Sequence, residues 1–296
     1  MRIGRNPNSS AFAPVKIEQI VLQVITNLPN QDGYHAHRLE VIKTCLTSMT
    51  KGAGVNHSLM ICDNGSIPEL LEWIRDEIKP TMLISSQNLG KAAQRKLMAH
   101  MLPPDSIICY SDDDIFFYNN WLVPQLVLLQ EFPHVASVTG YPVRTSFRWG
   151  NRNTKAWAEN NAKLTAGRFI PNQWERDFSV SIGRDVQEHL ISTQKDIDYL
   201  IEYNGLQAYA TSHHCQQVGY AGIFANALEF DGLAMGSERK YDERLDLLGL
   251  RLATIQRLAR HMGNVIDSEL RQAIQLETVQ QMGANTLMEV HNDRRN

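Results

Sequence analysis

The sequence is poor in cysteine and has no large excess of charge of either sign. Its four cysteines are Cys45, Cys62, Cys109 and Cys215. They are far apart and form no C-x-x-C pair, so neither a zinc site nor a disulfide framework is predicted. The formal net charge is -3 over 296 residues, which excludes a strong overall field for nucleic acid or for an anionic membrane. Because no disulfide framework is predicted, a reducing, cytoplasmic setting is expected.

Long apolar runs are also missing. No stretch of the sequence reaches the length of a membrane span. Residues 1–10 are polar and lack the apolar segment that a signal peptide needs. The hydrophobic content of 43% is ordinary for a globular protein, and the length allows one large domain or two modest ones.

Strand and helix patterns alternate through the first half of the chain, after a polar arm at residues 1–14. Strand patterns cover 17–25, 57–62, 82–85, 107–111 and 134–139, and helix patterns cover 38–49, 68–78, 91–102 and 121–131. This alternation predicts an α/β fold with a mostly parallel sheet and helices on both faces. In such sheets, ligands bind at the carboxyl ends of the strands.

The patterns beyond residue 143 are weaker. Residues 140–166 are basic and aromatic without clear strands, which suits a binding loop, and residues 186–203 have a helical pattern. Residues 241–288 are mostly helix formers, and apolar residues recur about every 3.6 positions from 245 to 262, which predicts a helical C-terminal extension over 235–296. The apolar face from Leu245 to Met262 is expected to support self-association.

Three consecutive carboxylates, Asp112, Asp113 and Asp114, follow the apolar strand pattern at 107–111. One alternative is a solvated acidic turn. Apolar residues on both sides favour burial instead, and adjacent buried carboxylates need a compensating cation, most simply Mn²⁺ or Mg²⁺. On an extended backbone, residues i and i+2 point the same way, so Asp112 and Asp114 are expected to converge. Such a metal often binds substrate phosphates, which predicts a phosphorylated substrate.

Two further motifs follow predicted strands. Asp63-Asn64-Gly65-Ser66 comes after the strand at 57–62, and Asn88-Leu89-Gly90 precedes a helix that carries Lys91 and Arg95. Taken singly, they are compatible with an Asx turn and with a solvated helix face. Because Asp63 and the acidic triplet each end a strand of one parallel sheet, we expect them to share a crevice.

In this order and spacing, Asp-Asn-Gly-Ser, Asn-Leu-Gly-x-x-x-x-Arg and Asp-x-Asp resemble the nucleotide-sugar domain of family 2 glycosyltransferases, which have the GT-A fold. The resemblance covers residues 17–143 and extends weakly to about residue 222. It implies metal-dependent, inverting transfer of a sugar from a UDP-sugar, or from a GDP-sugar, to an acceptor hydroxyl. It also implies a nucleotide-sugar-binding half at 15–143 and an acceptor-binding and catalytic half at 144–234.

The resemblance implies a role for each matched residue. The donor-binding residues would be Thr26, Asp63, Asn88, Arg95, Asp112 and Asp113, and the metal ligands would be Asp112, Asp114 and His214. Lys195-Asp196-Ile197-Asp198 is similar to the family's Glu-Asp-x-Asp segment, which makes Asp196 the general base. Asp198, Glu175 and Asp177 are rival bases. His213 is an alternative ligand, and a Gln217-Val218-Gly219 match to the related His-Val-Gly pattern would require neither histidine.

The acceptor stays open among a glycan, a lipid-linked sugar, a protein and a modified DNA base. Arg148, Trp149 and Trp174 are predicted to bind it, because tryptophan rings stack on flat groups such as sugars. Arg144, Arg148 and Arg152 form a basic cluster that is compatible with a polyanion such as DNA.

Two other functions compete with glycosyl transfer. A nucleotidyltransferase should carry a glycine-rich, basic loop after the first strand, but residues 26–30 contain neither glycine nor a basic residue. A catalytically silent nucleotide-sugar-binding module would bind the donor without transferring the sugar.

Overall fold

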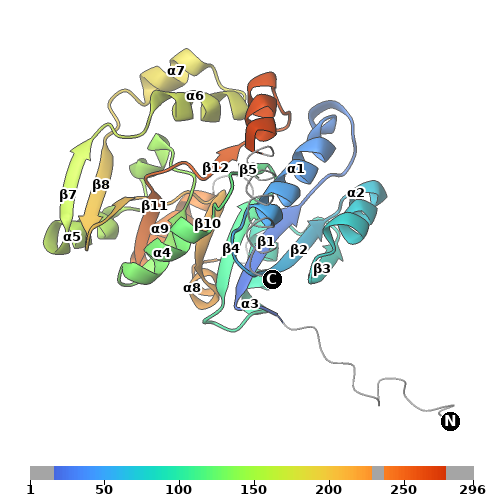
Figure 1. The fold of residues 1–296 in the computed structure, drawn as a ribbon, viewed down its shortest axis with the longest axis horizontal. Helices are drawn as coiled ribbons and strands as arrows, with labels where there is room; N and C mark the ends of the chain where they lie inside the picture. The colour runs from blue at the N-terminus through green and yellow to red at the C-terminus, as the bar shows by residue number, and fades with distance from the viewer. Residues whose placement is uncertain (1–16, 229–236, 278–296) are drawn as a thin grey trace, which may run out of the picture.

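The computed structural model describes residues 17–228 and 237–277 (Figure 1). Its first half contains β1 (Ile20–Thr26), α1 (Arg38–Lys51), β2 (Ser58–Asn64), α2 (Pro68–Trp73), β3 (Met82–Ser86), α3 (Lys91–His100), β4 (Ile107–Asp112), β5 (Ile115–Phe117), α4 (Val123–Glu131) and β6 (Val135–Thr139). Its second half contains α5 (Arg152–Asn161), β7 (Lys163–Gly167), α6 (Asn172–Ser181), α7 (Val186–Ser192), β8 (Asp198–Tyr203), β9 (Leu206–Tyr209), β10 (Gln216–Tyr220), α8 (Ala221–Ala227), α9 (Ser237–Leu248), β11 (Leu250–Thr254) and β12 (Ala259–His261). There are also short 3-10 turns at Gly33–His35 and Arg144–Arg148 and a π turn at Ile74–Ile78.

A ten-stranded sheet in the order β3-β2-β1-β4-β10-β6-β11-β9-β8-β7 forms the centre of the molecule. Strands β1 to β4 pair in parallel, and β11 is parallel to β6. Strand β10 runs antiparallel between β4 and β6, so it begins where β4 ends. A separate two-stranded sheet joins β12 to β5. These two antiparallel contacts bring late parts of the chain to the acidic triplet.

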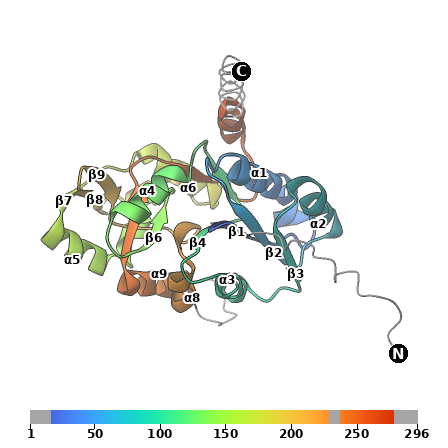
Figure 2. The ribbon, with the colours of Figure 1, turned by 60° about the horizontal axis from the view of Figure 1, so that its bottom comes forward.

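Helices cover both faces of the sheet, as the alternation predicts. Strand β1 is buried on both sides: Leu22 and Val24 pack with α1 residues, whereas Val21 and Ile25 pack with α3 and α8 residues. Figure 2 shows α1 and α2 on one side of the sheet and α3, α8 and α9 on the other. The predicted α/β class with helices on both faces is confirmed.

The helical prediction for the C-terminal region is wrong between residues 250 and 261. Helix α9 ends at Leu248, and β11 and β12 follow, with every β11 residue buried. Gly249 makes the change possible, because a side chain there would overlap the carbonyl oxygen of His134. The Leu245–Met262 face is therefore no continuous helical surface. A helix resumes at 268–277, while the predicted arm at 1–14 and residues 278–296 lie outside the described part.

Two other segments also differ from their predictions. The helical pattern at 186–203 divides into α7 and β8. The expected loop at 140–166 contains a 3-10 turn, α5 and most of β7. No helix among the described residues is long and apolar enough to cross a membrane.

Candidate active site

The acidic triplet lies at the carboxyl end of β4, close to the middle of the sheet. Strand β4 ends at Asp112, and residues 113 and 114 form a turn before β5. Strand alternation therefore ends at Asp112, and the expected convergence of Asp112 and Asp114 stays a prediction. Asp112 pairs with Lys91 of α3, whereas Asp113 and Asp114 share one partner, Arg38 of α1.

Asp112 is held by two groups on its own side of the triplet. Its Oδ2 lies 2.7 Å from Nζ of Lys91, the first residue of α3, and its Oδ1 accepts a 2.6 Å hydrogen bond from the Tyr110 hydroxyl. Burial opposes ionisation of Asp112, but the Lys91 ammonium and these hydrogen bonds outweigh it and lower the pKa of the carboxyl. Asp112 is therefore an ionised, oriented carboxylate.

Asp113 is bound within the protein by Arg38, at the start of α1. The Arg38 guanidinium donates to Asp113, which also accepts the backbone N–H of Asn27 at 3.1 Å. The same guanidinium lies 3.2 Å from Oδ2 of Asp114 and 3.2 Å from the Gly263 carbonyl oxygen. Asp113 thus ties β4 to α1, and its position favours a structural role over the predicted contact with the donor.

Asp114 differs from its neighbours because part of its carboxylate is unused. Its Oδ1 is buried and has no hydrogen-bond partner among the described residues. Its Oδ2 lies 3.5 Å from Nε2 of His261. Pairing of β5 with β12 places this histidine, and the Met262 amide donates to the Asp114 carbonyl oxygen at 2.8 Å. Sequence reasoning missed His261 because its segment was predicted to be helical.

The predicted donor residues Thr26, Asp63 and Asn88 lie on neighbouring strand ends. The Thr26 hydroxyl donates to Oδ1 of Asp63 at 3.2 Å, and Oδ2 of Asp63 accepts the backbone N–H groups of Gly65 and Ser66. Asn88 contacts this turn, because its Oδ1 accepts from the Asn64 side chain at 2.9 Å. Asp63 and Asp112 flank the end of β1 on the two neighbouring strands, and the crevice expected between them stays a prediction.

Arg95, the fourth donor residue predicted outside the triplet, is buried. Its guanidinium stacks between the rings of Tyr110 and Tyr241, with its carbon 3.7 and 4.5 Å from the ring centres, and donates to Gln217. Because the Tyr110 hydroxyl donates to Asp112, Arg95 contacts the triplet indirectly, through the Tyr110 ring. Contact with a bound nucleotide would require this stack to open.

A second carboxylate, Asp242 on α9, lies in a cavity of about 510 Å³ that is also lined by His213, His214 and His261. Its side chain lies 2.6 Å from the Arg251 guanidinium and 3.1 Å from Nδ1 of His214. Burial opposes its ionisation, but the Arg251 charge dominates and lowers the pKa of Asp242. His261 also lines a second cavity, which contains Asp114, so this histidine lies between the two carboxylate-bearing cavities.

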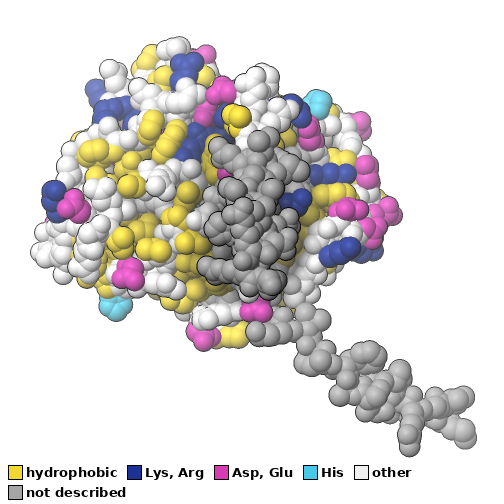
Figure 3. Space-filling model, in the orientation of Figure 1, with side chains coloured by type: hydrophobic (Ala, Val, Ile, Leu, Met, Phe, Trp, Pro, Cys, Tyr) yellow, Lys and Arg dark blue, Asp and Glu magenta, His cyan; other side chains and the backbone are white. Residues whose placement is uncertain are grey.

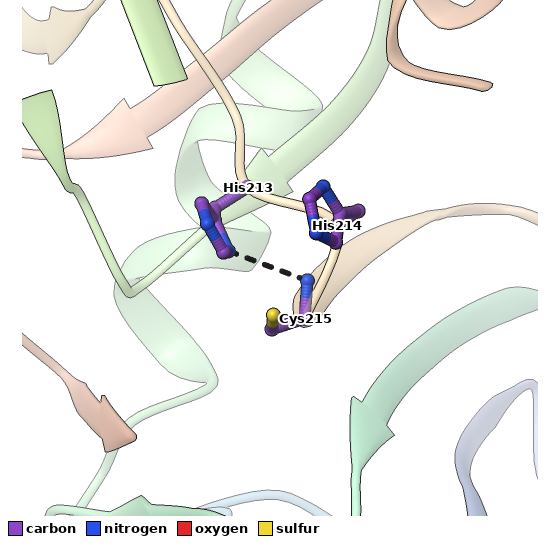
Figure 4. Close-up of side chains that lie close together, drawn as sticks. All are labelled: His213, His214 and Cys215. Atoms are coloured by element: carbon purple, nitrogen blue, oxygen red, sulfur yellow. Dashed lines mark hydrogen bonds between the residues drawn. The ribbon is translucent and has the colours of Figure 1, made fainter. Parts of the chain in front are cut away.

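The loop before β10 carries His213, His214 and Cys215, which line the same cavity as Asp242. Figure 4 shows these three side chains. The Cys215 carbonyl oxygen accepts the Asp112 amide at 2.8 Å, which fixes this loop against the end of β4. His213 is buried, and desolvation together with the neighbouring His214 lowers its pKa well below the ordinary value. The predicted metal ligand His214 points Nδ1 at Asp242, and no contact between His214 and Asp114 is observed.

The predicted base, Asp196, lies in the turn before β8. Its carboxylate pairs with Arg148 at 2.8 Å, and both side chains remain partly accessible. Of the rivals, Asp198 is fully buried against Arg144. Glu175 is buried and bonded to His189, and Asp177 pairs with Arg257 and Arg260. The rivals are therefore committed to internal ion pairs or hydrogen bonds.

Two of the three predicted acceptor residues line the cavity that contains Asp242, and Trp174 does not. Arg148 and Trp149 line the cavity that contains Asp242, and Trp149 is 37% exposed, with the Arg239 guanidinium 4.9 Å from its ring. Trp174 lies on α6 and has the Arg257 guanidinium 6.0 Å from its ring. Lys and Arg atoms are visible on the surface between α6 and β12 in Figure 3.

Comparison with known proteins places this geometry in context. The model of the family described as Glycosyl transferase family 2 matches residues 34–184, half of the chain. The match ends before both Asp196 and Asp242. No curated protein matches the chain.

Similar solved structures include S. aureus TarS 1-349, at 9% identity over 87% of this chain and 64% of that chain, with a TM-score of 0.47. GalNAc-T7 with UDP, GalNAc and Mn²⁺ is similar at 10% identity over 83% and 44%, with a TM-score of 0.48. The mannosyltransferase PcManGT from Pyrobaculum calidifontis, in complex with GDP-Man and Mn²⁺, is similar at 15% identity over 46% and 39%, with a TM-score of 0.35. The chain thus spans less than two thirds of each of these structures.

Proposed function

This chain belongs to glycosyl transferase family 2 and is a glycosyltransferase with the GT-A fold, and we propose that it moves a sugar from a nucleotide-sugar donor to an acceptor hydroxyl with inversion. The observation that carries this proposal is that His261 lines two cavities, one with Asp114 and the other with Asp242. The cavity with Asp114 suits a divalent cation, and the cavity with Asp242 offers an ionised carboxylate beside a space for an acceptor.

Asp114 and His261 fit a divalent metal. The buried Oδ1 of Asp114 lacks a partner in the described part of the chain, and a buried carboxylate oxygen without a hydrogen bond is a costly arrangement that a cation relieves. His261 offers an imidazole nitrogen 3.5 Å from the other oxygen. Mn²⁺ or Mg²⁺ held there, with Asp112 beside it, would stabilise the negative charge of the departing nucleoside diphosphate.

Lys91 and Asp63 suit the donor. Lys91 begins α3, where unpaired backbone N–H groups and the helix dipole favour an anion, and its ammonium is close to Asp112. Asp63 keeps one oxygen bonded only to Thr26, which leaves that oxygen able to accept a hydrogen bond from a nucleobase. Both residues therefore support the predicted binding of a UDP-sugar or GDP-sugar.

Asp242 is the general base in this proposal. Its lowered pKa keeps it ionised at neutral pH, and His214 and Arg251 fix the direction of its carboxylate. It takes the proton of the acceptor hydroxyl as that oxygen attacks the anomeric carbon. Asp196, the base implied by the sequence resemblance, remains the alternative, because Arg148 places it near the rim of the same cavity.

Three variants test the proposal with Mn²⁺ and a panel of UDP-sugars and GDP-sugars. Asp114→Asn should abolish Mn²⁺-dependent donor binding, measured by calorimetry. Asp242→Asn should retain donor binding but lower the rate of nucleotide release roughly 10²- to 10⁴-fold, the usual contribution of a general base. Asp196→Asn is the matched control and should change the rate less than about threefold, as expected of an exposed ion pair.

Other outcomes of this experiment would contradict the proposal. A rate loss confined to Asp196→Asn would identify Asp196 as the base. If the wild-type protein binds donors but releases no nucleotide with any acceptor, it is a silent binding module. Release of pyrophosphate from a nucleoside triphosphate would instead identify a nucleotidyltransferase.

A further inference from the structure

The loop before β10 brings together three side chains of the kinds that bind metal ions. Ligand atoms of His213, His214 and Cys215 all lie within 4.8 Å of one another. In the described part of the chain, no other trio of His, Cys, Asp or Glu side chains meets this condition. Figure 4 shows the two imidazole rings next to each other above the Cys215 side chain, and their ring centres are 4.6 Å apart.

The two histidines are available as ligands. His214 points Nδ1 at the Asp242 carboxylate, which leaves Nε2 for a metal. A carboxylate behind a ligating histidine is the usual arrangement in zinc sites, because it fixes the ring and increases its basicity. The ring nitrogens of His213 make only one hydrogen bond within the described residues, a 3.4 Å contact with the Cys215 amide.

The surroundings of this cluster also fit a bound ion. The edges of the Tyr141 and Phe178 rings face His213 at centre distances of 5.5 and 6.0 Å, which holds the imidazole in place and excludes water from one side. The other side opens into the cavity that contains Asp242. Two imidazoles and one thiolate are ligands for Zn²⁺ rather than for Mn²⁺ or Mg²⁺, which prefer oxygen.

We propose that His213, His214 and Cys215 form a zinc site that is separate from the Asp114–His261 site. Three protein ligands would leave one tetrahedral position for water or for an oxygen of a bound molecule. The sulfur–zinc bond forms as the thiol proton is released to solvent. The existence of this site does not depend on the proposed sugar transfer.

The location gives the ion a consequence for activity, and this part rests on the proposed function. Zn²⁺ would stand beside Asp242 in the cavity assigned to the acceptor. The ion would occupy part of the cavity proposed for the acceptor, and its positive charge would make the Asp242 carboxylate a weaker base. We therefore expect added Zn²⁺ to inhibit transfer while donor binding at Asp114 persists.

Cobalt is the direct probe, because Co²⁺ replaces Zn²⁺ and a thiolate ligand gives it a charge-transfer absorption in the near ultraviolet. Titration of the full chain should produce this band, and one equivalent of Zn²⁺ should remove it. Cys215→Ser should abolish the band and weaken Zn²⁺ binding about a hundredfold or more. Asp114→Asn, the matched control, should keep the band but lose Mn²⁺ binding.

A measurement on the wild-type chain covers the possibility that Cys215→Ser does not fold. Zn²⁺ should protect Cys215 from alkylation by iodoacetamide, as detected by mass spectrometry of the digested protein. Absence of both the band and the protection would overturn the zinc site. Loss of the band in Asp114→Asn would show one shared ion and overturn the claim of two sites. Failure of donor binding alone would count only against the proposed function.

Discussion

Replacement of Asp198 by Asn tests whether this carboxylate is structural or catalytic. Asp198 is fully buried, and its oxygens lie 3.0 and 3.3 Å from the Arg144 guanidinium. It also accepts the backbone N–H groups of Phe169 and Ile170 at 2.7 and 2.9 Å. Asn keeps the shape of the side chain but removes the charge and one acceptor, so Arg144 would be left buried without its counterion.

The expected cost follows from these contacts. Removal of one partner of a buried ion pair costs about 3–5 kcal/mol, because the other charge remains buried and unpaired. Asp196→Asn is the comparison, since Asp196 pairs with Arg148 where both side chains are partly accessible. Such a pair contributes about 0–1 kcal/mol. The two variants should therefore differ in stability by at least about 2 kcal/mol.

Equilibrium unfolding in urea, followed by tryptophan fluorescence and circular dichroism, measures the difference. At temperatures where it is folded, Asp198→Asn should bind donor and release nucleotide at the wild-type rate. The structural interpretation would be refuted by an Asp198→Asn protein of wild-type stability that has lost transfer activity. That result would make Asp198 a catalytic residue.

Two further variants test the donor side. Asp63→Asn replaces an acceptor oxygen by an N–H donor, so affinity for the preferred nucleoside diphosphate should fall about tenfold, equivalent to about 1.4 kcal/mol; equal affinities in calorimetry would place the nucleobase elsewhere. Arg95→Leu removes the cation stacked between Tyr110 and Tyr241 and should lower the free energy of unfolding by about 1–3 kcal/mol with little direct effect on donor contacts. A fall in donor affinity at unchanged stability would instead support the predicted donor contact of Arg95.

Local sequence patterns were sufficient to predict the strands and helices of the first half of the chain. Strands β1 to β4 are apolar runs that end in turn-forming residues, and the helices between them have polar and apolar faces. Parallel strands place their carboxyl ends at one edge, so the placement of Asp63 and the triplet at the same edge of the sheet followed from order alone. The family resemblance added roles for these residues, and the family match confirms the class of enzyme.

Local sequence patterns did not predict the strands and helices of the second half in the same way. Leu250–Thr254 is buried on both sides, so its apolar residues fit a helix pattern as well as a strand pattern. His261 reaches Asp114 only because β12 pairs with β5, and Asp242 reaches its cavity only because α9 packs against one face of the sheet. Contacts between residues so far apart in the chain leave no periodic signal in the sequence.

The sequence by itself determined the parallel strands of the first half, the acidic strand end and the family, because these depend on periodicity and on neighbouring residues. The tertiary structure decided how the triplet is divided. Arg38 binds Asp113 and one oxygen of Asp114, Lys91 binds Asp112, and His261 lies near that same oxygen of Asp114. Within the described part of the molecule, the other oxygen of Asp114 has no hydrogen-bond partner. These partners come from α1, α3 and β12, and only folding brings charges from such distant segments within a few ångströms of each other.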